Sequence, residues 1–291
     1  MNFRIVFAML ALLGLAGLVH AHDQCSDATL DGRYVTSSHS QFTNPKFNLV
    51  DVSANVALIN FDGHGHFTVT SGVVNADGTI YYFTENGTYV VNADCSYQNT
   101  GILALQTPYG VFNLPSTVAG VIVDHGRRIE IMSGAPNGAG AFTETSGLVA
   151  GTVEKLERTE CRNPARVHYA LHGLILGTPD GPPGNYVAAT VVGTASSDDA
   201  GNLTGNVIKN FGSNVQPGTI NASLVVNPDC TVIWTGAGEG ANHFYGVAVM
   251  KHDSVDLHMV ETDAPPTDPN TGANLPGTTV EFTAVGTPQY E

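Results

Sequence analysis

The residues best suited to acid–base chemistry lie in two short segments, one late in each half of the chain. Glu130 stands between two isoleucines, and Asp256 and His258 alternate with apolar residues. Side chains alternate between the two faces of a strand, so Asp256 and His258 share one face. A carboxylate and an imidazole placed in this way can share a substrate proton. If this polar face lines a lumen, all three residues are candidate catalytic groups; if it faces water, they are ordinary surface residues.

A second group of potential ligands occupies a glycine-containing turn. His64 and His66 lie close to Asp62, which is the composition of a metal site. The equivalent positions in the second half are Ala200 and Asn202, and a tight turn rarely directs three ligands at one ion. We therefore interpret the histidines as solvated turn residues and predict no metal.

Short runs rich in β-branched and aromatic residues must position these groups. Residues 66–74 and 80–91 flank a turn in the manner of hairpin arms. We interpret 37–50 as a long loop before a strand at 53–61. Regularly spaced short strands predict an all-β sandwich or barrel, and the short connections favour an antiparallel barrel of mostly up-and-down hairpins.

The chain repeats itself. The phrase V-V-N-x-D-C occurs at 90–95 and again at 225–230, and matching turns and strands precede and follow it in the same order. Such self-similarity predicts a duplicated domain, with copies at 22–158 and 159–291. Each copy is of ordinary domain size and can bury its own core.

The cysteines follow the duplication. Cys25 and Cys95 have nearly the same spacing as Cys161 and Cys230. A single ancestral domain had only its own two cysteines, so we expect the pairs Cys25–Cys95 and Cys161–Cys230. A four-thiolate zinc site is excluded because no two cysteines have the close spacing that such sites require.

The first residues, 1–21, have the pattern of a signal peptide. Arg4 precedes an apolar run to Val19, and Ala21 provides a small residue for cleavage. Secreted or periplasmic localisation follows, and it permits disulfides. The formal net charge of −15 gives no electrostatic basis for binding nucleic acid or, after cleavage, a membrane.

Three phrases together resemble a known group of proteins. They are L-x-G-x-Y at 30–34, D-G-x-G at 62–65 and G-x-Y-x-V-x-x-D-C at 87–95. They resemble secreted bacterial tandem β-barrel proteins, which are similar in fold to allene oxide cyclases, dirigent proteins and other calycin-like barrels. The shared residues are turn glycines, cysteines and core positions, so no catalytic residue is carried over.

The resemblance implies a small-molecule-binding barrel, with a cofactor-free cyclase or isomerase of secondary-metabolite biosynthesis as one activity. Glu130 or the Asp256–His258 pair would then handle the proton. The alternatives are a carrier of an apolar ligand and an extracellular interaction module with a filled core. The chain has no G-x-S-x-G elbow, phosphate loop or dinucleotide fingerprint, which argues against ordinary serine hydrolases, kinases and dehydrogenases.

Two further features bear on binding and modification. Aromatic residues cluster at 81–83 and around Trp234, where they are typical of core or cross-strand pairs but also suit a ligand. Asn86, Asn202 and Asn221 begin N-x-[ST] sequons, and they are glycosylation candidates in a host that glycosylates secreted proteins.

Overall fold

The structure of the protein is a computed structural model. It describes residues 24–44, 49–76, 79–107, 109–133, 147–158, 160–163, 166–177, 187–211, 214–237, 242–263 and 279–288. The expected signal peptide, 1–21, lies outside the described residues.

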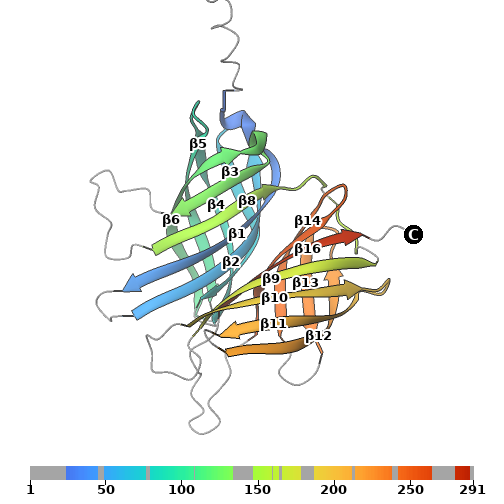
Figure 1. Ribbon diagram of the computed structural model, residues 1–291. Coiled ribbons are helices and arrows are strands. Elements are labelled where there is room, and N and C mark those ends of the chain that lie inside the picture. The colour runs from blue at the N-terminus through green and yellow to red at the C-terminus, as the bar shows by residue number, and fades with distance from the viewer. Residues whose placement is uncertain are drawn as a thin grey trace, which may run out of the picture.

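The chain folds into two closed antiparallel β-barrels, as the sequence predicts, and each barrel has eight strands. Figure 1 shows them as two bodies in contact, with β2 of the first barrel near the second. Every pairing in both barrels is antiparallel, and each barrel closes by pairing its first strand in the chain with its last. The first barrel contains β1 (Asp31–Asn44), β2 (Leu49–Asp62), β3 (His66–Ala76), β4 (Thr79–Val91), β5 (Ser96–Thr107), β6 (Gly110–Val123), β7 (Arg128–Ser133) and β8 (Gly147–Lys155). The second contains β9 (Val167–Gly177), β10 (Val187–Ser197), β11 (Asn202–Phe211), β12 (Asn214–Val226), β13 (Thr231–Gly236), β14 (His243–Met250), β15 (Val255–Glu261) and β16 (Thr279–Pro288).

The predicted loop at 37–50 is wrong. β1 and β2 continue through most of it, and their ladder extends to the pair Asn44 and Leu49. The composition at 37–40, Ser-Ser-His-Ser, is typical of a loop, but Ser37 and Ser38 are both buried. A strand whose two faces are both covered by protein can carry small polar side chains, and its composition then resembles that of a loop.

The two disulfides join Cys25 to Cys95 and Cys161 to Cys230, which confirms the expected pairing. The similarity of the two barrels extends to the backbone around them. Cys95 and Cys230 both have positive φ, of 64° and 71°. Each cysteine carbonyl accepts a hydrogen bond from the second strand that follows it in the chain. The donors are Ile122 N in β6 (2.9 Å) and Ala248 N in β14 (2.8 Å). These shared bonds fix the correspondence between residues of the two barrels.

Aromatic rings close one end of the first barrel. Phe61 contacts Tyr34 and Tyr89 edge-on, with ring centroids 5.1 Å and 5.0 Å apart. The Tyr34 hydroxyl donates to the Gly126 carbonyl at 2.9 Å, and the Tyr89 hydroxyl donates to the Leu30 carbonyl at 2.9 Å. Buried phenol hydroxyls thus find backbone acceptors in the segments that cover this end. The short 3-10 helix η1 (Asp27–Thr29) belongs to that cover.

Part of the outer face of the first barrel is buried against the second barrel. β2 packs against β14, β15 and β16, so side chains that point away from the first lumen are buried against the second barrel. Polar contacts across this interface include Arg33 Nη2 to Asp229 O (2.8 Å), Ser71 Oγ to Tyr245 OH (2.8 Å) and Asn75 Nδ2 to Glu261 O (3.0 Å). The apolar residues of the interface are Val35, Ala54, Val56, Leu58 and Val73 from the first barrel and Val247, Val249 and Val260 from the second.

Two disulfides are typical of a protein from an oxidising environment, such as the periplasm or the extracellular space. Within the described part of the chain, no helix has the length and apolar character needed to cross a membrane.

Removing one disulfide should destabilise the barrel that contains it. The loops that the bridges close span 70 and 69 positions, so we expect C161A/C230A to lower the free energy of unfolding by roughly 4 kcal/mol in the chain-entropy model. The chain has one tryptophan, Trp234, and it lies in the second barrel, so its fluorescence during urea denaturation reports that barrel.

The matched variant C25A/C95A should leave the Trp234 transition nearly in place if the barrels unfold separately. An equal shift in both variants would show that the barrels unfold as one unit. A C161A/C230A variant whose Trp234 transition has the same urea midpoint as the wild type would contradict the prediction.

Candidate functional site

Glu130 does not line a lumen. On β7 the residues Ile129 and Ile131 face the interior, and Glu130 points outward with its side chain about half exposed. Its carboxylate is 2.7 Å from Arg128 Nη2, another half-exposed group on the same strand face. An exposed ion pair of this kind contributes little stability, and it lies on the outer face of the barrel, away from the lumen. A catalytic role for Glu130 inside the barrel therefore finds no support in this geometry.

Asp256 and His258 share one face of β15, as the alternation predicts, but this face meets neither the lumen nor open water. It faces the first barrel, where Glu154 of β8 approaches it. His258 Nε2 lies 3.6 Å from Glu154 Oε2, and Lys251 Nζ lies 2.6 Å from Glu154 Oε1 and also contacts Asp256 Oδ2. The structure thus joins Asp256 and His258 into an inter-barrel charge cluster with Glu154 and Lys251, and Glu130 is not part of it.

The inter-barrel charge cluster is mostly buried, with side-chain exposures between 12% and 33%. Burial alone would raise the pKa of Glu154, but the neighbouring His258 and Lys251 outweigh it and lower that pKa to about 2. Burial also opposes the charge on Lys251, yet its two carboxylate partners raise the Lys251 pKa above its usual value. Such a cluster is suited to holding two domains in register, because Lys251 of the second barrel contacts the Glu154 carboxylate of the first.

The histidines of the predicted turn are solvated. His66 Nδ1 lies 3.0 Å from Asp62 Oδ2, and both side chains are well exposed. The backbone nitrogen of His64 donates to Asp62 Oδ1 at 2.7 Å, which fixes the turn. Across the described residues, no group of three or more His, Cys, Asp or Glu side chains is placed to hold a metal ion. The sequon residues Asn86, Asn202 and Asn221 are all exposed.

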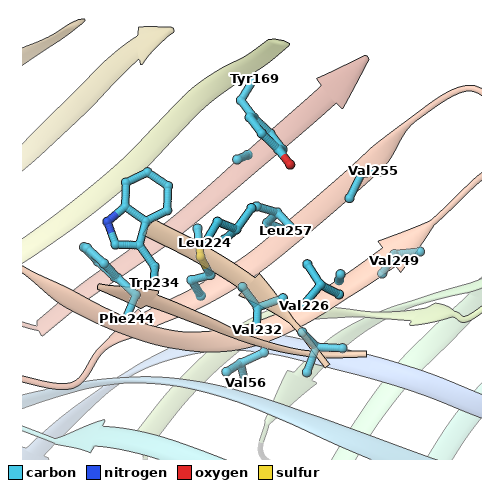
Figure 2. Close-up of a cluster of buried hydrophobic side chains, with 14 of the residues drawn as sticks. Val56, Tyr169, Leu224, Val226, Val232, Trp234, Phe244, Val249, Val255 and Leu257 are labelled. Atoms are coloured by element: carbon cyan, nitrogen blue, oxygen red, sulfur yellow. The ribbon is translucent and has the colours of Figure 1, made fainter. Parts of the chain in front are cut away.

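The lumen of the second barrel is filled by side chains. Trp234 and Phe244 are paired across β13 and β14, with ring centroids 6.0 Å apart, and both are buried. Figure 2 shows them side by side, with Leu224 and Leu257 further along the interior. Ile220 on β12 packs against the same apolar cluster. This part of the duplicated domain is a solid core.

The first barrel has different residues at the same places. The bonds at Cys95 and Cys230 and the strand registers make Asn99 and Val118 the counterparts of Trp234 and Phe244. They likewise make Glu85 on β4 the counterpart of Ile220. Three large apolar side chains of one barrel are thus replaced by an amide, a carboxyl and a smaller aliphatic group in the other.

Glu85 is a buried carboxyl facing the lumen of the first barrel. Its side chain is only 8% exposed, and Oε1 has no hydrogen-bond partner among the described residues. Burial raises the pKa of Glu85, and a hydrogen bond with Ser116 on β6 only partly opposes this. Gly101, on the strand between them, makes room for the carboxyl: a Cβ there would lie 2.5 Å from Oε1. An unsatisfied buried carboxyl is costly and marks a candidate functional site.

Apolar side chains extend from Glu85 toward the other end of this lumen. Leu103 and Leu105 are partly exposed, and the lumen-facing Leu114 and Phe112 of β6 are 48% and 51% exposed. On the opposite wall Asn55 Nδ2 donates to Ser38 Oγ at 2.7 Å. Large apolar side chains left exposed on the inward face of a barrel are a candidate contact surface for an apolar ligand.

Sequence reasoning missed Glu85 and Glu154. Both lie in strands of ordinary alternation, and neither belongs to one of the motifs in the sequence. The repeat alignment contained a signal for Glu85, because Asn86 aligns with Asn221 and the preceding residues are then glutamate in one copy and isoleucine in the other.

Comparison with known proteins adds no functional information. The chain matches no protein-family model, and no curated protein matches its sequence. The functional argument therefore rests on the side chains of the two barrels.

Replacing Glu154 by glutamine should weaken the docking of the barrels. We expect a loss of about 1.5–3 kcal/mol in the free energy of unfolding at neutral pH, because Lys251 and His258 lose a charged partner. The folded pKa of Glu154 lies below its ordinary value of 4.5, so its stabilisation is present above pH 4.5 and is lost as pH falls toward 2. Urea denaturation of both proteins at a series of pH values should show the difference shrinking across that window.

Glu130→Gln is the matched control, because it removes an exposed carboxylate from an ion pair worth about 0–1 kcal/mol. A Glu154→Gln difference that stays constant down to pH 2 would contradict the assignment.

Replacing Glu85 by glutamine should stabilise the protein at neutral pH. The pKa of Glu85 is higher in the folded state than in the unfolded state, so folding is favoured at low pH and the advantage is lost as pH rises through that interval. Glutamine has the same shape without the titrating carboxyl. The melting temperature of Glu85→Gln should therefore exceed that of the wild type at neutral pH, whereas at pH 3 it should not. Thermal unfolding followed by circular dichroism at both pH values provides the measurement.

Proposed function

We propose that the protein is a secreted ligand-binding protein whose first barrel holds one apolar small molecule in its lumen. The second barrel is a filled structural copy that packs against the outside of the first. The observation that carries this proposal is the difference at equivalent lumen positions, where Asn99, Val118 and Glu85 replace Trp234, Phe244 and Ile220.

The size of these side chains supports the assignment to the first barrel. A closed barrel of about eight strands has an interior that is either filled by side chains or wide enough for one small ligand. The Trp234–Phe244 pair fills this level in the second barrel. In the first barrel, the Asn99 side chain folds back to accept a hydrogen bond from Val118 N at 2.9 Å.

The position of the acid–base candidates supports binding over catalysis. Glu130 faces outward, and Asp256 and His258 are engaged with Glu154 and Lys251 between the barrels. A cyclase or isomerase that uses those residues would need them beside a bound substrate. The proposal therefore favours a carrier, and the filled interaction module describes only the second barrel.

The proposal predicts that the barrel-2 aromatic pair, transferred to barrel 1, abolishes binding. N99W/V118F should lose affinity for the fluorescent apolar probe N-phenyl-1-naphthylamine by at least about tenfold, because the rings occupy the level where the ligand sits. Fluorescence titration of wild type and variant measures this directly. Native mass spectrometry of wild type from its own medium or periplasm should show a small-molecule adduct that is lost on denaturation.

Val121→Phe is the matched control, because Val121 lies on the same strand, faces outward and is 51% exposed. Its probe affinity should equal that of the wild type. Retained binding in N99W/V118F with unchanged circular dichroism would refute the lumen site, and a wild type that binds neither probe nor adduct would refute the function itself.

A further inference from the structure

The buried carboxyl of Glu85 indicates which chemical class the first barrel selects. No Lys, Arg or His side chain among the described residues pairs with it; its one side-chain partner is the Ser116 hydroxyl. A buried charge normally has a counter-charge or a set of hydrogen bonds. Glu85 has neither within the described chain, so the group that completes its hydrogen bonding is to be sought in the ligand.

The protonation state of Glu85 limits the partner. Burial raises the pKa of Glu85, which favours the neutral acid with its O–H donor. Tyr97 on β5 is the titratable neighbour that interacts with it electrostatically, and the Tyr97 pKa is itself raised by burial, so that neighbour stays neutral. A neutral acid in an apolar site donates a hydrogen bond most effectively to a neutral oxygen acceptor.

The backbone around the carboxyl is built for it. On β5, Gly101 pairs with Ser116 of β6 and lies two residues from Leu103, the partner of Glu85. A Cβ on Gly101 would lie 2.5 Å from Glu85 Oε1, so a side chain there would occupy the place of the carboxyl. Beyond it, Leu103 and Leu114 pair across β5 and β6 on the lumen face. A ligand that lies along these leucines with its polar end at Glu85 matches both surfaces.

We propose that the first barrel selects an apolar molecule with one neutral oxygen acceptor, such as a ketone, aldehyde or ester carbonyl, which accepts a hydrogen bond from the carboxylic acid of Glu85. This inference rests on the proposed function. It adds that the ligand's polar group is neither an amine nor a carboxylate: an amine would require the ionised acid, and a carboxylate would place a second acid beside Glu85.

Competition against N-phenyl-1-naphthylamine with three probes of matched chain length tests the proposal. The probes are 2-octanone, n-octylamine and octanoic acid, used on wild type, Glu85→Leu and Glu85→Gln at pH 6. We expect the wild type to bind 2-octanone at least about tenfold better than the other two. Glu85→Leu should retain dye binding and lose this preference, whereas Glu85→Gln, whose amide still donates, should keep it.

The outcomes separate the two proposals. Dye binding with a preference for n-octylamine, or a ketone preference that survives in Glu85→Leu, would overturn the ligand class and leave the binding function standing. Absence of dye binding in a folded wild type would overturn both. If Glu85→Leu fails to fold, the pH profile decides: ketone affinity should fall at high pH in the wild type and stay constant in Glu85→Gln.

Discussion

A closed eight-stranded barrel encloses an interior of limited width, which is either filled by side chains or left wide enough for one small ligand. Most other features of this protein depend on how each copy meets that constraint. The second barrel does so with its own side chains, and Trp234 and Phe244 make its middle a continuous core. The first barrel packs a cluster of aromatic rings at the end covered by η1, and beyond it presents Glu85 and Asn99. Buried Phe83, exposed Phe112 and partly exposed leucines follow on the same inward face. The two barrels share one strand order and one mode of closure, and they differ at several inward positions.

The outward faces of β2 and β3 form the contact with the second barrel. Val56 and Val73 point away from the first lumen, and both are completely buried because the second barrel covers them. β2 and β3 therefore carry apolar residues on both faces, like strands of a sandwich core. Where this interface reaches β8, Glu154 meets Lys251 and His258 across it, and Lys251 also contacts Asp256 of its own barrel. Apolar burial supplies the attraction, and the charge cluster makes one register preferable to others.

Under the proposed function, Glu85 is a position where stability and binding oppose each other. A residue like the Ile220 of the other barrel would pack without any polar cost. A carboxyl whose Oε1 has no partner pays a desolvation penalty in the absence of a ligand. Binding sites commonly retain groups that disfavour the empty folded state, because the same groups provide selectivity once the ligand is present. The glycine at position 101, which weakens a strand but leaves space for the carboxyl, fits the same interpretation.

The sequence alone determined the features that depend on local pattern and repetition. The all-β class, the two copies and the disulfide pairs follow from alternation, turn chemistry and the recurring V-V-N-x-D-C phrase, and the structure confirms them. Alternation also placed Asp256 and His258 on one face. Only the tertiary structure decided what that face meets, because the strand period separates two faces without identifying the neighbour of either. Glu154 lies about a hundred residues away in sequence, and the side of β15 that it approaches is set by the docking of whole barrels. Likewise, the sequence shows Glu85 only as a polar residue within a strand. Its burial on the inward face follows from the closure of the barrel.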